Sequence, residues 1–223
     1  MGAQPPAGAG GYLFNMPIKN IIFDLGGVLL HIDYNLTEKA FVELGCKNFG
    51  LVYSQAQQTA LFDDYERGVI DEAAFFYKLK NLANLDVPFG EMKRAWNAML
   101  INFPEENYNL LRSLQGRYRL FLLSNTNHTH IAAFTHLVEK VCPMAEFENL
   151  FEKIYYSNYI GLKKPGVAPF LKILLQNSLS ADETLFIDDS IQHIKGALKT
   201  GIRAELLPKG KSTRRFLEEL KLL

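Results

Sequence analysis

The sequence predicts an α/β fold: a Rossmann-like parallel sheet core with a small α-helical domain inserted after its first strand. Three observations support this prediction. Short apolar, β-prone runs alternate with helix-like segments, which is the pattern of a parallel sheet covered by helices on both faces. Between residues 35 and 104 the strand signal disappears and helical periodicity replaces it. Three of the apolar runs end in polar side chains, which a parallel sheet collects at one edge.

The expected elements follow this alternation along the chain. Strands are expected at 20–25, 119–123, 153–156, 184–187 and 203–207. Helices of the inserted segment are expected at 37–44, 55–66, 71–82 and 91–100. We therefore expect residues 16–34 and 105–223 to form the core and residues 35–104 to form a helical cap. Residues 1–15, rich in Gly, Ala and Pro, lack the features of a signal peptide and predict a disordered leader or an expression remnant.

The composition limits the classes of function. The chain has 223 residues with 24 basic and 24 acidic side chains, so its formal net charge is zero. No basic stripe suggests nucleic-acid binding, and no apolar run approaches the roughly 20 residues that span a bilayer. The two cysteines, Cys46 and Cys142, lack the paired spacing of metal or redox motifs, which indicates reduced thiols and a cytoplasmic location. We expect a monomer or weak homodimer with a small-molecule partner.

The first apolar run delivers Asp24 into a turn that contains Gly26 and Gly27. An acid placed at the end of a strand, where the backbone can close around an anion, can act as a nucleophile and form a covalent intermediate. A single strand-end Asp is more often a turn former or a helix cap. The nucleophile hypothesis therefore depends on the motifs that follow.

Adjacent acids, Asp188 and Asp189, end another apolar run. Their mutual repulsion is costly unless a cation offsets it, and Mg²⁺ prefers such oxygen ligands. The alternative, an acidic N-cap for the helix that starts near Ile191, explains only one of the two acids.

Two further polar motifs fit an anion site. Ser124 can donate its hydroxyl to a phosphate oxygen, and main-chain N–H groups at the following helix start, beginning with Asn125, can assist; its alternative role is a helix N-cap. Lys164, in a Lys-Lys-Pro sequence, can place an ammonium group beside a phosphate and a carboxylate. Lys163 competes for this role, and solvated lysine pairs are common.

In their order, Asp24, Ser124, Lys164 and the pair Asp188-Asp189 resemble the motifs of the haloacid dehalogenase-like hydrolase superfamily. The resemblance implies that Asp24 is the nucleophile and that Lys164, which precedes Pro165, is the catalytic lysine. It assigns phosphate binding to Ser124, Asn125 and Gly27. Magnesium would be held by the side chains of Asp24, Asp188 and Asp189 and by the backbone carbonyl of Gly26. The segment 65–71 looks like the cap turn of the superfamily's sugar-phosphatase-like branch.

Gly26 departs from this pattern, because phosphatases of the superfamily usually carry a second Asp there as general acid and base. One branch, the sugar-1-phosphate phosphatases, also has Asp-Leu-Gly at this point. We therefore expect a Mg²⁺-dependent phosphatase that hydrolyses a small phosphorylated metabolite, a sugar phosphate, through an aspartyl phosphate. His31 or Asp33 could replace the missing base, although both are more typical of loop residues.

Two alternatives remain open at this level. A 2-haloacid dehalogenase uses an Asp nucleophile without metal, but Gly26 and the acid pair argue against it. A phosphate-binding pseudophosphatase would retain Mg²⁺ and anion binding without turnover, and the loss of an acid at Gly26 favours it. Four histidines lack the spacing of a metal site and are expected at surface or cap positions: His128, His130, His136 and His193.

Overall fold

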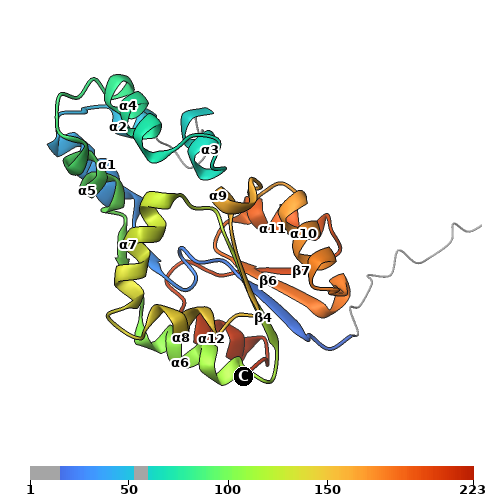
Figure 1. Cartoon of the computed structure of the whole chain (residues 1–223). Helices are drawn as coiled ribbons and strands as arrows, with labels where there is room; N and C mark the ends of the chain where they lie inside the picture. The colour runs from blue at the N-terminus through green and yellow to red at the C-terminus, as the bar shows by residue number, and fades with distance from the viewer. Residues whose placement is uncertain (1–15, 53–59) are drawn as a thin grey trace, which may run out of the picture.

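A computed structural model describes residues 16–52 and 60–223 of the chain. Its centre is a parallel five-stranded sheet in the order β5-β4-β1-β6-β7 (Figure 1). The strands are β1 (Asn20–Phe23), β4 (Arg119–Ser124), β5 (Lys153–Tyr156), β6 (Thr184–Asp188) and β7 (Arg203–Leu206). All five match the strands expected from the sequence within two residues at each end, and the predicted fold class is confirmed.

Helices cover both faces of the sheet (Figure 1). One face packs against α6 (Glu105–Leu114), α7 (His128–Val138), α8 (Met144–Glu148) and α12 (Thr213–Glu219). The other packs against α10 (Ala168–Gln176) and α11 (Ile191–Leu198). A short helix, α9 (Ser157–Ile160), follows β5, and a 3₁₀ turn, η1 (Ala181–Glu183), precedes β6. This double covering buries β1 and β6 completely and explains why their sequences are apolar on both faces.

The segment between the first two core strands forms a separate helical lobe (Figure 1). It contains α1 (Tyr34–Glu43), α2 (Phe49–Val52), α3 (Ala60–Glu66), α4 (Glu72–Leu82) and α5 (Phe89–Asn97). Aromatic side chains dominate its own apolar core, in which Phe75 packs against Phe62 and Trp96. We call this lobe the helical insertion.

A small antiparallel ribbon joins the helical insertion to the core. It pairs β2 (His31–Ile32) with β3 (Leu100–Asn102). The prediction of a helix over 91–100 is wrong at its end, because α5 stops at Asn97 and the chain enters β3. The expectation that residues 35–104 contain no strand is wrong for the three residues of β3. Residues 53–59, at the start of the helix expected at 55–66, lie outside the described chain.

Within the described residues, no helix is both long and apolar enough to cross a membrane.

Candidate active site

A cavity of about 670 Å³, including space open to solvent, lies where the core strands end and the helical insertion approaches them. It forms at the carboxyl ends of parallel strands, where ligands bind in folds of this type. Six of the residues predicted for the site line it: Asp24, Gly26, Ser124, Asn125, Lys164 and Asp189. The other two, Gly27 and Asp188, do not line it but contact residues that do: Gly27 lies against Asp189, and Asp188 pairs with Lys164.

The centre of the site is an ionic group of Lys164 and two acids. The Nζ atom of Lys164 lies 2.7 Å from Oδ1 of Asp24 and 2.6 Å from Oδ2 of Asp188. The side chains of Lys164 and Asp188 are fully buried, and that of Asp24 is only 10% exposed. One ammonium therefore bridges the acid after β1 and the acid that ends β6, although these residues are far apart in sequence.

His193, in the first turn of α11, is the site residue that the sequence analysis missed. Its Nδ1 atom lies 3.0 and 2.9 Å from the two carboxylate oxygens of Asp188, to which it donates as the Nδ1–H tautomer. The main-chain N–H of Ser190 also donates to Asp188. In the sequence, the one available signal was that His193 follows Asp188 by five residues. This spacing lets a residue in the first turn of a helix contact the strand-end acid, but it is not a metal-binding motif.

The three carboxyl groups differ in their electrostatic surroundings. Burial raises the pKa of Asp24, with a further contribution from Asp188, although Lys164 opposes the shift. Burial alone would raise the pKa of Asp188 too, but Lys164 and His193 hold it below its ordinary value. Desolvation and the neighbouring Asp188 raise the pKa of Asp189. Because three carboxyl groups surround a single lysine, their negative charge is not fully offset, and this favours the binding of a cation.

The glycine turn after Asp24 brings the backbone close to the acid pair. Gly27 has a φ of +76°, and a Cβ atom there would lie 2.1 Å from Oδ2 of Asp189. At Gly26 a Cβ atom would lie 3.0 Å from Cδ1 of Ile32. The space beside Gly26 is therefore occupied by an apolar side chain from β2.

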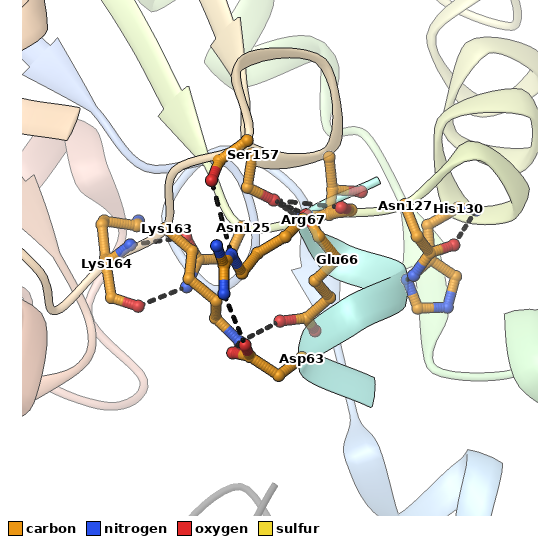
Figure 2. A network of polar contacts seen from close by, with 11 residues as sticks. Asp63, Glu66, Arg67, Asn125, Asn127, His130, Ser157, Lys163 and Lys164 are labelled. Atoms are coloured by element: carbon orange, nitrogen blue, oxygen red, sulfur yellow. Dashed lines mark hydrogen bonds and ion pairs between the residues drawn. The ribbon is translucent and has the colours of Figure 1, made fainter. Parts of the chain in front are cut away.

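Asn125 and Lys164 are joined through the backbone of the lysine (Figure 2). Oδ1 of Asn125 accepts from the Lys164 N–H at 2.9 Å, and Nδ2 donates to the Lys164 carbonyl at 2.9 Å. Ser124, which precedes Asn125, ends β4 and is 4% exposed.

The side chain of the neighbouring Lys163 points to the helical insertion and not to Asp24 and Asp188 (Figure 2). Its Nζ atom lies 2.5 Å from Oε2 of Glu66 and 3.2 Å from Oδ1 of Asp63, both in α3. The two lysines therefore have different partners. Only Lys164 of this pair contacts Asp24.

Other candidates from the sequence lie elsewhere. Asp33 is the N-cap of α1 and accepts from Asn35, and His31 contacts Asn102 across the ribbon. Neither lines the cavity. The expectation of surface or cap positions is wrong for His130, which lines the cavity from α7 and stacks on Trp96, as it is for His193.

The comparisons with known proteins agree with this geometry. A family comparison matches residues 21–206 to the haloacid dehalogenase (HAD)-like hydrolases. A D-ribitol-5-phosphate phosphatase from Bacteroides thetaiotaomicron is 28% identical over 177 residues, which cover 79% of this chain and 85% of that protein.

Two solved structures extend the likeness to the whole fold. A predicted HAD-like family hydrolase from Porphyromonas gingivalis is 27% identical, with a TM-score of 0.81 over 92% of this chain and 98% of that one. A HAD family enzyme from B. thetaiotaomicron, in complex with magnesium and inorganic phosphate, is 29% identical, with a TM-score of 0.78 over 89% and 98% of the two chains. The family match covers most of the sequence, and the chain therefore belongs to the haloacid dehalogenase-like hydrolases.

Proposed function

We propose that this protein is a Mg²⁺-dependent phosphatase that hydrolyses a small phosphorylated metabolite, a sugar phosphate, through an aspartyl-phosphate intermediate. The observation that carries the proposal is the contact of one buried ammonium, Lys164, with both Asp24 and Asp188 beside an open cavity. The relatives add support, because one is a D-ribitol-5-phosphate phosphatase and another was solved with magnesium and inorganic phosphate.

In the proposed reaction, a carboxylate oxygen of Asp24 attacks phosphorus, and the bond from phosphorus to the substrate oxygen breaks. The substrate oxygen leaves with the bonding electron pair and takes a proton from solvent. Lys164 offsets the repulsion between the carboxylate and the incoming phosphate. The Ser124 hydroxyl and main-chain N–H groups around Asn125 and Gly27 bind the phosphate oxygens. Water then attacks the aspartyl phosphate, releasing inorganic phosphate and regenerating Asp24.

The residues present fit a magnesium ion. Asp24, Asp188 and His193 place potential ligand atoms within 4.8 Å of one another, and Asp189 lies against the backbone of Gly27. We assign the carbonyl of Gly26 and the carboxylates of Asp24 and Asp189 as direct ligands, since Asp188 already accepts from Lys164, Ser190 and His193. Bound magnesium would supply positive charge that keeps Asp24 ionised.

We also propose residues 35–104 as the cap that selects the substrate. The segment 65–71, which resembles the superfamily's cap turn, begins with three residues that have different surroundings. Glu66 lines the cavity, whereas Tyr65 is buried against Thr129 and Arg67 donates to the carbonyl of Gly161. Of these three side chains, Glu66 is therefore the proposed specificity residue.

A phosphate-release assay over phosphorylated metabolites, with Mg²⁺ and with EDTA, tests the proposal. We expect turnover with Mg²⁺, fastest for sugar 1-phosphates and aryl phosphates, and its loss in EDTA. Halide release from haloacetate in EDTA would instead establish a 2-haloacid dehalogenase. Mg²⁺-dependent phosphate binding without turnover of any substrate would establish the pseudophosphatase.

A further inference from the structure

The side chain of Asn125 holds the backbone of the catalytic lysine at both of its polar groups. Its two amide atoms bind the N–H and the carbonyl of Lys164, each at 2.9 Å (Figure 2). This paired contact resembles the bonds that a neighbouring strand makes to one residue. Because a single planar amide makes both bonds, it restricts sliding and rotation of the lysine main chain.

Small movements of this main chain matter because of where the lysine side chain ends. The Nζ atom is fully buried between Asp24 at 2.7 Å and Asp188 at 2.6 Å. The geometry of both contacts depends on the position of the Lys164 backbone, which belongs to a loop and not to the sheet. A displacement of about 1 Å in a reacting group can cost roughly 10²-fold in rate.

Asn125 fixes this loop to the centre of the sheet. It directly follows Ser124, the last residue of β4, and β4 pairs with β1, whose end carries Asp24. On the opposite side the loop rests on α11, where a Cβ atom on Gly196 would lie 2.2 Å from the carbonyl oxygen of Pro165. The lysine loop is therefore held between β4 and α11.

We propose that Asn125 is a positioning residue that sets the lysine between the two acids, and that its side chain does not bind substrate. This inference rests on the proposed phosphatase function for its rate measurements. It revises the role expected from the sequence, in which Asn125 binds phosphate. Its main-chain N–H can still do so, because the bonds to Lys164 use only the side chain.

The first test separates catalysis from substrate binding. Asn125→Ala should lower kcat for an aryl phosphate by roughly 10²-fold while KM changes less than about threefold, because the lysine is misplaced and the phosphate contacts remain. Asn20→Ala is the control: Asn20 is a buried asparagine whose amide donates to the Glu183 carbonyl and to Thr184 at the amino ends of β1 and β6, the opposite end of the sheet from the cavity. It should lower stability and leave kcat unchanged.

The decisive test is a double-mutant cycle with Lys164→Met. If Asn125 acts through the lysine, adding Asn125→Ala to Lys164→Met should change kcat by less than about twofold. Equal losses in both backgrounds, or a loss expressed in KM alone, would overturn the inference. If Asn125 had only a structural role, Asn125→Ala would lower the melting temperature and would reduce kcat by the same factor with or without Lys164.

A second form of the cycle does not depend on turnover. The affinity for inorganic phosphate with Mg²⁺, measured by calorimetry, should fall by no more than about threefold in Asn125→Ala, in line with KM, and should not fall further when Lys164→Met is already present. Additive losses would contradict the inference. If wild-type protein binds phosphate but hydrolyses no phosphate ester, the proposed function fails and this binding cycle still decides the role of Asn125.

Discussion

Gly26 and Ile32 together determine what stands next to the nucleophile. The added Cβ of any residue at position 26 meets Cδ1 of Ile32 at 3.0 Å, whereas the other Ile32 atoms are 3.7 Å or more away. Ile32→Val removes this one methyl group. An acid at position 26 therefore needs the second substitution to fit beside Asp24.

We expect Gly26→Asp/Ile32→Val to narrow the preference for good leaving groups. Wild-type protein should favour aryl over alkyl phosphates, because no acid at position 26 protonates the leaving oxygen. General acid assistance contributes roughly 10² to 10⁴-fold, so the aryl-to-alkyl ratio of kcat/KM should fall by at least about tenfold. Gly26→Ala/Ile32→Val, which adds the carbon without the acid, is the control. The same ratio in both double variants would refute this explanation.

His130 makes the stability of the fold sensitive to acid. Its Nε2–H donates to the Trp96 carbonyl at 3.2 Å, and its Nδ1 accepts from Asn127 at 3.2 Å, so the neutral ring is fully bonded. Burial lowers the pKa of His130 to about 4. Since the unfolded chain has the higher pKa, it binds the proton more readily, and stability is lost as pH falls from about 6.5 towards 4.

The prediction compares wild-type protein with His130→Asn. Between pH 7 and pH 5, the stability that His130 contributes should fall by about 2 kcal/mol, and the difference in unfolding free energy between the two proteins should shrink accordingly. Urea unfolding at both pH values measures it. His136→Asn, at an exposed histidine of the same helix, should leave the difference from wild type unchanged. If the difference in unfolding free energy between wild type and His130→Asn is the same at both pH values, the pKa of His130 does not differ between the folded and unfolded chain.

At the scale of elements, Lys163 ties the loop before Pro165 to α3 of the helical insertion. Its side chain is 13% exposed and that of Glu66 is 11% exposed, so solvent screens their contact only partly. Removing the ammonium of Lys163 takes one ionic contact away from both Glu66 and Asp63. The contact therefore holds α3 of the insertion against the loop that carries both lysines.

Lys163→Met should therefore loosen α3 without unfolding the core. A loss of about 1 to 2 kcal/mol corresponds to roughly 5- to 30-fold faster local opening, which hydrogen exchange of the α3 amides measures. Lys153→Met is the control, because Lys153 contacts Gln176 of α10 and the Tyr155 ring of β5, neither of which belongs to α3. Unchanged exchange in α3 would show that the ion pair does not hold the insertion.

The strands β1, β4 and β6 could be predicted from sequence because nearly all their residues are buried and they read as apolar runs. The ribbon could not, since β2 and β3 are two and three residues long and mostly exposed. β3 also follows directly on the helical pattern of α5, which concealed its start. Pairing between residues about 70 positions apart in the sequence, as in His31 and Asn102, gives no local signal.

The charged centre of the site was predictable for the same reason, since Asp24 directly follows buried β1 and Asp188 is the last residue of buried β6. Three features were not. His193 lies on a helix, the role of Ile32 depends on its distance from Gly26, and the amide of Asn125 bonds to a backbone 39 residues away. Each depends on tertiary contact, which a motif does not encode.

For the whole molecule, the site joins β1, β4, β6 and α11, so a bound ion should stabilise the folded chain. Saturation at 100 times the dissociation constant contributes about 2.7 kcal/mol, or a rise of roughly 5 to 10 °C in Tm for a chain of this size. Asp188→Asn and Asp189→Asn should each reduce the rise that Mg²⁺ causes. Asp182→Asn, in η1 before β6, should retain it. A wild-type Mg²⁺ response in both site variants would rule out the metal assignment.

The proposed function requires that Asp24 becomes phosphorylated during turnover, and rapid-quench kinetics with a ³²P-labelled aryl phosphate detects that step. Without an acid or base at position 26, hydrolysis of the aspartyl phosphate should limit the rate. We predict a burst of the aryl product and a hydroxylamine-sensitive label on the peptide that contains Asp24. Asp24→Asn should keep its fold and show neither label nor turnover. Turnover by wild-type protein without a burst and without labelled Asp24, or near-wild-type activity in Asp24→Asn, would contradict the account.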